Sequence, residues 1–510
     1  MRASLLATAV AVGFAAMLTI DNTAAGPRDT YIPASAITNA AQLRETALTS
    51  DLGYRITESL TTQVGPRMAG SEADARAVAW AQAKFRELGF DKVWVEPVTF
   101  PKWQRRSEHA RVLGANAQPL TLTALGGSPA GTVEGEVVRF ADLAALEAAA
   151  PGSLAGRIAF IDYKMERARD GSGYGPGSRV RSRGPSAAIR AGASAYLMRS
   201  AGTDSHRNPH TGITRFDDGL TPIPSAALAV PDAEQLSRLL KLGAQRVRVA
   251  LDCGWDGTAT SYNVIGEITG SEAAGSEAAG SEAAGSKAAG SKAAGSEAAG
   301  SKAGGSKKAN EVVLIGGHLD SWDLGTGAID DGAGVGLTMA AARLIGDMKQ
   351  RPARTIRVVA FANEEQGLYG GKAYALRHAK DVVRHQLAAE SDFGAGRIYA
   401  YSSSAPPHAQ AADRQIAEAL APLGIEHTPG KGGPGPDIGP FAAQGMAWAT
   451  LRQDGSDYFD LHHTPDDTFD KIDPKALAQN VAAYAVFAYL AASAEGDFGS
   501  AAKAVTPPTE

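Results

Sequence analysis

Strand-like and helix-like runs alternate over the second half of the chain, and this alternation most restricts what the chain can fold into. The strand-like runs are "TSYNVIGEI", "EVVLIGGH", "TIRVVAFANEE", "HQLAAESD" and "AWATLRQD". Helix-like segments lie among them, including "DGAGVGLTMAAARLIGDM" and "PKALAQNVAAYAVFAYLAASA". Strands that alternate with helices predict an α/β fold in which helices flank a mixed, largely parallel sheet.

Residues 26–117 are predicted to form the first part of this domain. The segment "SEADARAVAWAQAKFRELGF" predicts a helix that Ser71 caps and Gly89 ends, and the segment "KVWVEPVTF" after it predicts a strand. We assign residues 253–510 to the second part of the domain, because the α/β pattern resumes there.

Residues 118–252 have a different pattern. Four short strand-like runs, "GTVEGEVVRF", "GRIAFIDY", "ASAYLMR" and "IPSAALAV", are separated by a Gly/Arg/Ser-rich stretch and one helix, "PDAEQLSRLLKLG". We interpret this region as a β-rich module inserted into the main domain. The alternative is that the chain has two domains in sequence.

Two further segments stand apart from the fold. Residues 1–25 have an arginine near the start, an uncharged apolar stretch and small residues at Thr23 and Ala25, which predicts a signal peptide cleaved after Ala25. The alternative, a membrane anchor, is disfavoured because the apolar run is short for a spanning helix. Residues 270–308 repeat a GS[EK]A unit with glycine every five residues, which predicts a low-complexity spacer without a catalytic role.

Composition excludes several classes of function. A formal net charge of −5 gives no basic surface for nucleic acid, and no membrane association is expected after signal removal. A single cysteine, Cys253, excludes an intrachain disulfide framework. The Gly-x-Ser-x-Gly motif of serine hydrolases is also absent from the sequence. Because residues 1–25 are predicted to be a signal peptide, the mature protein is expected to be exported, either to the periplasm or outside the cell.

Ionisable residues follow four of the strand-like runs of the second half. Each motif alone has an ordinary explanation, such as a surface turn or a helix N-cap, but together they indicate one site at the carboxyl ends of the strands. The residues concerned are His318, Asp320, Asp330, Asp331, Glu364, Glu365, Asp392, His462 and His463.

Buried carboxylates are costly unless positive charge neutralises them, so this convergence predicts a metal site. Imidazole and carboxylate ligands without thiolate suit Zn²⁺, with Co²⁺ or Mn²⁺ as alternatives. Two ions that share a carboxylate would also acidify a water into a nucleophile. A further carboxylate is then needed to move the proton to the leaving amine.

Four segments, in the order "GGHLDSWDLGTGAIDDGAG", "NEEQG", "ESDFGA" and "YFDLHHTPDDT", resemble motifs of the co-catalytic zinc exopeptidases of the aminopeptidase and glutamate carboxypeptidase superfamily. The segment "NPHTGITRFDDGLTPIPSAALAV" similarly resembles a protease-associated insert of that family. The resemblance covers nearly the whole mature chain except the spacer.

The resemblance implies a role for each matched position. His318 and Asp392 would bind one zinc ion, Glu365 and His463 the other, and Asp330 would bridge them. Glu364 would be the general base and acid, and Asp320 would orient His318. A cis peptide bond is expected between Asp330 and Asp331. His462 is a candidate for stabilising the oxyanion, and Asp437 is a candidate for contacting substrate or for a turn.

These expectations favour an exported di-zinc exopeptidase that acts on dipeptides or short peptides. One alternative is a single-zinc acyl transferase of the glutaminyl cyclase type, and another is a non-catalytic peptide-binding relative. Close members of the resembled family form dimers, so a homodimer is a further possibility that no pattern in the sequence demonstrates. The preference between the free amine and the free carboxylate of a substrate stays open at this point.

Overall fold

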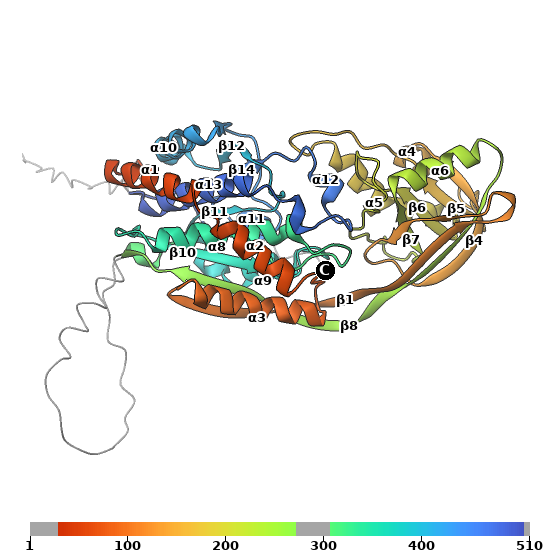
Figure 1. Ribbon diagram of the computed structural model, residues 1–510, viewed down its shortest axis with the longest axis horizontal. Coiled ribbons are helices and arrows are strands. Elements are labelled where there is room, and N and C mark those ends of the chain that lie inside the picture. Colours follow the sequence, from red (N-terminus) through yellow and green to blue (C-terminus); the bar gives the residue numbers. More distant parts are fainter. Residues whose placement is uncertain (1–28, 272–306, 504–510) are drawn as a thin grey trace, which may run out of the picture.

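The computed structural model describes residues 29–271 and 307–503. The predicted signal peptide lies outside these residues, as does the predicted spacer except for its two ends. The described chain forms two lobes joined by a long two-stranded ribbon (Figure 1). The larger lobe holds both ends of the described chain, and the smaller lobe is formed by residues that lie between the two ribbon strands.

The ribbon consists of β1 (Lys92–Val112) and β8 (Arg246–Ile268), which pair antiparallel over almost their full lengths. β1 runs from the larger lobe into the smaller one and β8 runs back, so β8 crosses the predicted boundary at residues 252–253 without a break. One sheet therefore passes through both lobes, in the order β11-β9-β10-β8-β4-β5-β6-β7-β3.

In the larger lobe, β9 (Val312–His318), β10 (Thr355–Phe361) and β11 (His385–Glu390) are parallel neighbours. Every residue of these three strands is buried, as expected for strands covered on both faces. β8 joins their edge antiparallel to β10, which makes the sheet mixed.

Side chains of β9 alternate between two hydrophobic layers. Val313 and Ile315 belong to the layer formed with α1 (Ala34–Leu48), α2 (Leu52–Gln63), α3 (Glu72–Glu87), α8 (Ala333–Gly346) and α13 (Pro474–Ser493). Val312 and Leu314 belong to the layer formed with α9 (Tyr369–Arg377) and α11 (Gly439–Ala443). This period of two places helices on both faces of the sheet, as the sequence predicts.

The strand predicted at "AWATLRQD" is confirmed as β14 (Ala449–Gln453), but it lies outside the main sheet. It belongs to a second sheet with β12 (Ile398–Ser403) and β13 (Glu426–His427). A single parallel bridge, Ala388 to Trp448, connects it to β11. Helix α10 (Gln410–Leu420) lies between β12 and β13 in the chain and packs on α13.

The smaller lobe is built on the parallel strands β4 (Gly131–Phe140), β5 (Ile158–Ile161), β6 (Ala195–Arg199) and β7 (Ser225–Leu228). The short β3 (Leu122–Ala124) pairs antiparallel with β7, and β2 (Gln118–Leu120) pairs with β1. Helices α4 (Leu143–Glu147) and α6 (Val230–Leu240) also belong to this lobe. One hydrophobic cluster lies wholly within this lobe, and a second also includes Met68 and Trp322 of the larger lobe.

The Gly/Arg/Ser-rich stretch of this lobe forms a helix that the sequence does not predict, α5 (Tyr174–Arg190). Pro185 lies inside it and lacks the N–H that would bond to the Arg181 carbonyl. The Thr214 hydroxyl donates to that carbonyl instead, at 2.9 Å. A Cβ on Gly184 would lie 2.1 Å from the Tyr196 hydroxyl, so the close packing requires glycine there.

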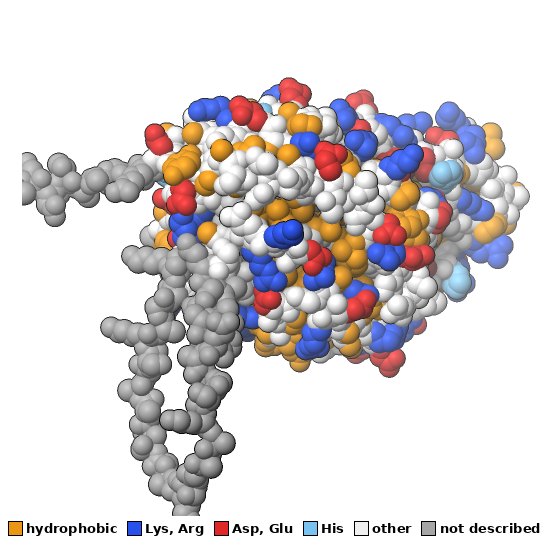
Figure 2. Space-filling model, turned by 60° about the vertical axis from the view of Figure 1, so that its left-hand side comes forward, with side chains coloured by type: hydrophobic (Ala, Val, Ile, Leu, Met, Phe, Trp, Pro, Cys, Tyr) orange, Lys and Arg blue, Asp and Glu red, His pale blue; other side chains and the backbone are white. Residues whose placement is uncertain are grey.

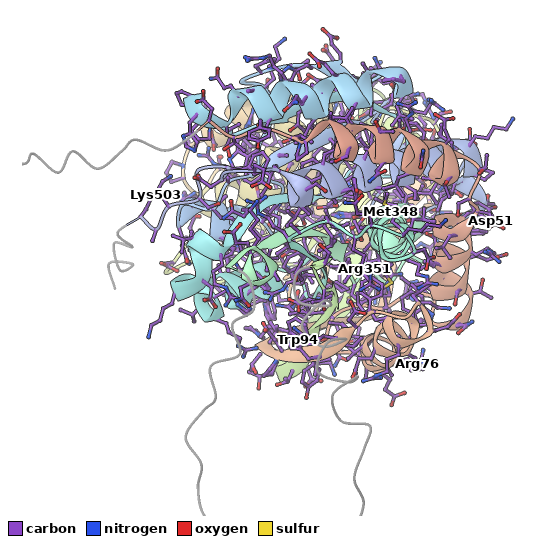
Figure 3. All side chains as sticks on the ribbon, turned by 90° about the vertical axis from the view of Figure 1, so that its left-hand side faces the viewer. Asp51, Arg76, Trp94, Met348, Arg351 and Lys503 are labelled. Atoms are coloured by element: carbon purple, nitrogen blue, oxygen red, sulfur yellow. The ribbon has the colours of Figure 1, made fainter. Side chains whose placement is uncertain are left out.

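Local signals in the first part of the larger lobe are confirmed. The Ser71 side chain accepts a hydrogen bond from the Asp74 N–H at 3.1 Å and caps α3, and Gly89 follows the helix with φ +72°. Figure 3 shows the end of the molecule away from the smaller lobe, where Arg76 on α3 and Trp94 on β1 lie along the lower edge. Basic and acidic side chains are interspersed over the face in Figure 2, which agrees with the small net charge.

Helix α13 is apolar and long enough to span a membrane, but it is a core helix. Its most apolar 18-residue window is 89% buried within the protein. The helix contacts α1, α2, α8 and α10, so its apolar surface is covered by the rest of the lobe.

Candidate metal centre and active site

The carboxyl ends of the three parallel strands carry the predicted site residues. His318 is the last residue of β9, Glu364 and Glu365 follow β10, and Asp392 follows β11. Asp330 lies in the segment Ala328–Gly332 directly before α8, and the peptide bond between it and Asp331 is cis, as predicted. Parallel strands place these residues at one edge of the sheet.

The second half of the site comes from outside the main sheet. Helix α12 (Tyr458–Leu461) is short, and His462 and His463 follow it directly. Three non-glycine residues in the described chain have a positive φ, and all three flank or belong to the site: Asn363, Leu368 and His463. Left-handed backbone of this kind costs about 1–3 kcal/mol per residue and is concentrated at functional sites.

The five predicted metal ligands form two clusters that share one carboxylate. In the first, His318 Nε2 lies 3.0 Å from Asp330 Oδ1 and 3.6 Å from Asp392 Oδ1. In the second, His463 Nε2 lies 3.2 Å from Asp330 Oδ2 and 2.8 Å from Glu365 Oε2. The two oxygens of Asp330 therefore face different clusters.

The donor atoms fit divalent cations. Asp330 Oδ2 and Glu365 Oε1 are buried, and neither accepts a hydrogen bond from any residue that the structure describes. Burial raises the pKa of Glu365 to about 7, and burial together with Asp392 and Glu365 raises the pKa of Glu364 well above its usual range. These acids hold protons unless positive charge is supplied, and their oxygen and imidazole donors suit Zn²⁺.

Glu364 differs from its neighbour Glu365 in its surroundings. It belongs to neither cluster but lines the cavity in front of them. Its backbone N–H donates to Asp320 Oδ1 at 3.0 Å, which fixes the turn that carries both glutamates. A carboxylate in this position is available for proton transfer rather than for holding an ion.

Asp320 contacts His318 through its backbone. His318 Nδ1 donates to the Asp320 carbonyl oxygen at 3.0 Å, and the Asp320 carboxylate is farther away, at 3.6 Å. Asp331 also positions His318, because its Oδ2 accepts a hydrogen bond from the His318 backbone N–H at 3.0 Å. The first imidazole is thus held in place by groups on both sides of it.

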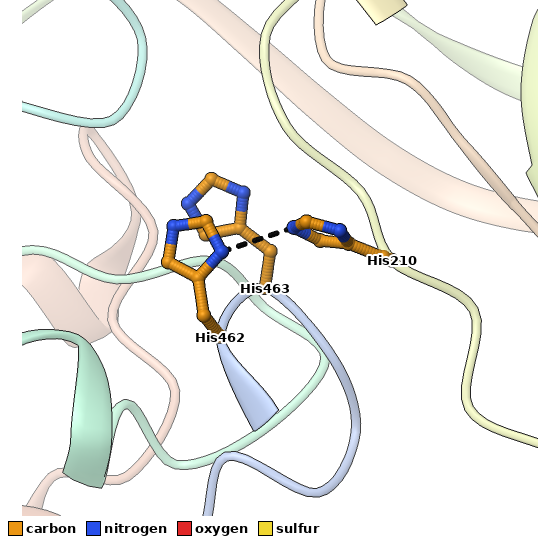
Figure 4. A group of neighbouring side chains, drawn as sticks. All are labelled: His210, His462 and His463. Atoms are coloured by element: carbon orange, nitrogen blue, oxygen red, sulfur yellow. Dashed lines mark hydrogen bonds between the residues drawn. The ribbon is translucent and has the colours of Figure 1, made fainter. Parts of the chain in front are cut away.

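His210, which was not among the predicted site residues, adds a buried imidazole from the smaller lobe (Figure 4). Its Nδ1 donates to the Ala201 carbonyl oxygen at 2.5 Å, and its Nε2 lies 3.0 Å from His462 Nδ1. His462 stacks on His463, with ring centroids 3.4 Å apart. The only sequence signal for His210 is its place in the segment that resembles a protease-associated insert.

This contact fixes the tautomer of His462. A carbonyl only accepts, so His210 carries its proton on Nδ1, and burial lowers the pKa of both imidazoles well below the usual value. Neutral His210 accepts from His462 Nδ1–H, which leaves the lone pair on His462 Nε2, 3.4 Å from Asp330 Oδ2. In this form His462 Nε2 accepts a hydrogen bond, and the oxyanion role of His462 stays a prediction.

A cavity of about 350 Å³ opens onto the two clusters. The larger lobe lines it with site residues and with Phe393, Pro436 and Tyr458, and the smaller lobe lines it with Tyr174, Arg181, Ile213 and Arg215. Asp437 does not line this cavity. It is buried behind the wall, where its Oδ1 accepts from the Gly371 N–H at 3.0 Å. The smaller lobe therefore forms part of the site.

Comparison with known proteins agrees with this geometry. A family model described as "Peptidase family M28" matches residues 300–488. Carboxypeptidase Q from Bos taurus is 31% identical over 86% of this chain and 84% of its own length, and that from Homo sapiens is 30% identical over 86% and 84%.

Solved structures of peptidases are also similar to this chain. The crystal structure of a peptidase M28 precursor from Shewanella amazonensis SB2B is 46% identical, with a TM-score of 0.81, over 93% of this chain and 99% of that one. An aminopeptidase from Aneurinibacillus sp. strain AM-1 shares the fold at 21% identity, with a TM-score of 0.57, over 92% and 98% of the two chains. The chain belongs to peptidase family M28, within the co-catalytic zinc exopeptidase superfamily, and is a metallopeptidase.

Proposed function

We propose that the protein is an exported di-zinc exopeptidase that hydrolyses dipeptides or short peptides. The observation that carries the proposal is the sharing of Asp330 by two clusters of metal-ligating side chains, in the second of which Asp330 Oδ2 and Glu365 Oε1 are buried and accept no hydrogen bond from a described residue. His318 and Asp392 would hold one ion, and Glu365 and His463 would hold the other. Asp330 would bind both.

When bound, two zinc ions would supply Lewis acidity, which lowers the pKa of a water and polarises a peptide carbonyl. The remaining steps belong to the chain's own side chains. Glu364 lines the cavity, so it would take the proton from the attacking water and return it to the nitrogen of the leaving amine. Asp320 would hold the turn that carries Glu364 in place, because its Oδ1 accepts a hydrogen bond from the Glu364 backbone N–H at 3.0 Å.

His462 would contribute as an acceptor. Because His462 lines the cavity, the lone pair on its Nε2 would bind an N–H group of the substrate. The inserted lobe would limit access, because it forms one wall of a cavity at the small end of the range for ligand sites. Small peptides with free ends fit this arrangement. The apolar stretch at residues 1–25 supports export.

A dipeptide and aminoacyl-amide library, assayed with and without a chelator, tests the proposal. We expect chelator-sensitive hydrolysis of small peptides by protein that holds two zinc ions per chain by mass spectrometry. One tightly bound zinc together with cyclisation of N-terminal glutamine would favour the glutaminyl cyclase alternative. Peptide binding without turnover would favour the non-catalytic alternative.

A further inference from the structure

The two imidazoles of the donor clusters are oriented by different lobes. His318 Nδ1 donates to the Asp320 carbonyl oxygen at 3.0 Å, so the larger lobe orients this ring by itself. His463 Nδ1 instead lies 3.3 Å from the carbonyl oxygen of Thr211, which belongs to the smaller lobe. A carbonyl oxygen only accepts, so His463 Nδ1 carries a proton, and the neutral ring has its lone pair on Nε2, within the second cluster. The smaller lobe therefore directs the lone pair that would hold the second ion.

Thr211 contacts His463 through its main chain as well. The Thr211 N–H donates to the His463 carbonyl oxygen at 3.0 Å, so one residue of the smaller lobe bonds to both the backbone and the ring of His463. Thr211 is fully buried, and its hydroxyl donates to the Ala124 carbonyl oxygen of the same lobe at 2.8 Å. A movement of the smaller lobe against the larger one would thus displace the His463 ring.

A buried carboxylate joins the segment before His463 to the smaller lobe. Asp460 lies on α12, three residues before His463, and α12 lies on the side of the larger lobe that faces the smaller one (Figure 1). Asp460 accepts from the Thr203 N–H at 2.5 Å and from the Thr203 hydroxyl at 3.0 Å. It also accepts from the Asp204 N–H at 3.2 Å and from the Arg167 guanidinium group. All of these donors belong to the smaller lobe, so Asp460 fixes α12 against it.

Another ion pair between the two lobes does not involve α12. Arg169 Nε of the smaller lobe lies 2.8 Å from Asp454 Oδ2 of the larger lobe, and the two side chains are 54% and 34% exposed. An exposed pair of this kind contributes little to docking. The buried contacts of Asp460 and Thr211 are therefore the ones that connect docking of the smaller lobe to the position of His463.

We propose that Asp460 is a positioning residue for the second ion, which binds with full affinity only when the smaller lobe is docked on α12. The first ion, with His318 and Asp392 as ligands, does not depend on this contact. Because coupling between two sites is reciprocal, binding of the second ion in turn stabilises the docked smaller lobe. The inference rests on the proposed function, in which Glu365 and His463 hold the second ion.

The test measures the two affinities of the metal-free protein for Zn²⁺ by competition with a chelating dye. Removing a partner that orients a ligand usually weakens metal binding by about 10- to 100-fold, so D460A should weaken the second ion by this factor. The first ion should keep its affinity within about twofold, because its imidazole is oriented within the larger lobe. D460N should lose less affinity, since its amide oxygen can still accept from the N–H groups of Thr203 and Asp204.

Two controls separate positioning from a general loss of structure. R169M removes the exposed ion pair between the same two lobes, and both affinities should stay within about twofold of those of the unmodified protein. The E365Q variant is expected to hold one ion, and adding D460A to it should leave the affinity for that ion unchanged. A merely structural defect would weaken the remaining ion as well.

Hydrogen exchange tests the reciprocal effect without changing Asp460. The backbone N–H groups of Thr203, Asp204 and Thr211 all donate to acceptors in the larger lobe. Loading the unmodified protein with Zn²⁺ should slow exchange of these groups by about fivefold or more. Loading E365Q, which lacks a ligand of the second ion, should leave their exchange unchanged.

The outcomes distinguish the inference from the proposed function. If D460A weakens both ions equally or weakens neither, the inference is overturned while the proposed function stands. Exchange that slows equally in E365Q and the unmodified protein would also overturn the inference. If D460A does not fold, D460N and the exchange measurement still decide the question. If the unmodified protein binds fewer than two Zn²⁺ ions, the two-ion arrangement of the proposed function itself fails.

Discussion

Replacing each of the two neighbouring glutamates by glutamine should separate proton transfer from metal binding. Glu365 Oε2 lies 2.8 Å from His463 Nε2 within the second donor cluster, whereas Glu364 lies outside both clusters. Glutamine has nearly the same shape as glutamate but cannot take up a proton at neutral pH. The two variants therefore differ in which function they remove, although the residues are adjacent.

For E364Q we expect two bound zinc ions and a kcat lower by about 10²- to 10⁴-fold, the usual contribution of a general base. This corresponds to about 3–5 kcal/mol of activation free energy. The hydrogen bond from residue 364 to Asp320 uses the backbone N–H, so the substitution leaves it intact. Because burial raises the pKa of the Glu364 carboxyl, a neutral amide at this position should not lower the unfolding temperature.

For E365Q we expect a zinc content that falls from two ions per chain towards one. Metal analysis by mass spectrometry, kcat for a dipeptide and calorimetric unfolding form the assay for both variants. The reasoning is refuted if E364Q hydrolyses peptide at the unmodified rate with both ions bound. It is also refuted if E364Q loses metal while E365Q keeps it.

Three further changes have defined outcomes. Removing metal with a chelator should lower the unfolding temperature measured by calorimetry, because an ion present at 1,000 times its Kd stabilises the folded state by about 4 kcal/mol. An unchanged unfolding temperature would contradict the presence of a metal site. Replacing residues 272–306 by a short Gly/Ser link should preserve kcat and change the unfolding free energy by less than about 2 kcal/mol, because the Thr355 hydroxyl already bonds to Gly270 N–H and the Ala309 carbonyl oxygen. A large loss of activity would give the spacer a role. Burial, followed by the charge of Arg357, lowers the pKa of the His385 imidazole to about 3. As the pH falls, the unfolded chain therefore takes up a proton on His385 before the folded protein does. The free energy of unfolding should therefore fall by up to about 1.4 kcal/mol per pH unit between pH 6.5 and about pH 3. In urea titrations at a series of pH values, the free energy of unfolding of H385Q should depend less steeply on pH over that range. The same pH dependence in H385Q and the unmodified protein would contradict the lowered pKa of His385.

Local sequence signals predicted much of the larger lobe. The cap at Ser71, the strands that end near His318 and Glu364, and the helix that follows Asp331 are specified by neighbours in the chain. The residues at the ends of the parallel strands also converge, because strand direction alone places them at one edge. The placement of β14 in a second sheet was missed, because sheet membership depends on pairing rather than on the strand's own sequence.

Features that depend on tertiary contacts could not be predicted in this way. Helix α5 contains Gly184 and Pro185, which disfavour a helix locally. Contacts with Thr214 and Tyr196 stabilise it in the folded protein. The contribution of the smaller lobe to the site was missed for the same reason, since 252 positions separate His210 from His462.

The most direct test of the account is anomalous diffraction at the zinc edge from crystals of the metal-loaded protein. The account predicts two peaks about 3.5–4 Å apart, with one oxygen of Asp330 directed to each. His318 and Asp392 should coordinate one peak, and Glu365 and His463 the other. A single peak, or two peaks that do not share Asp330, would contradict it.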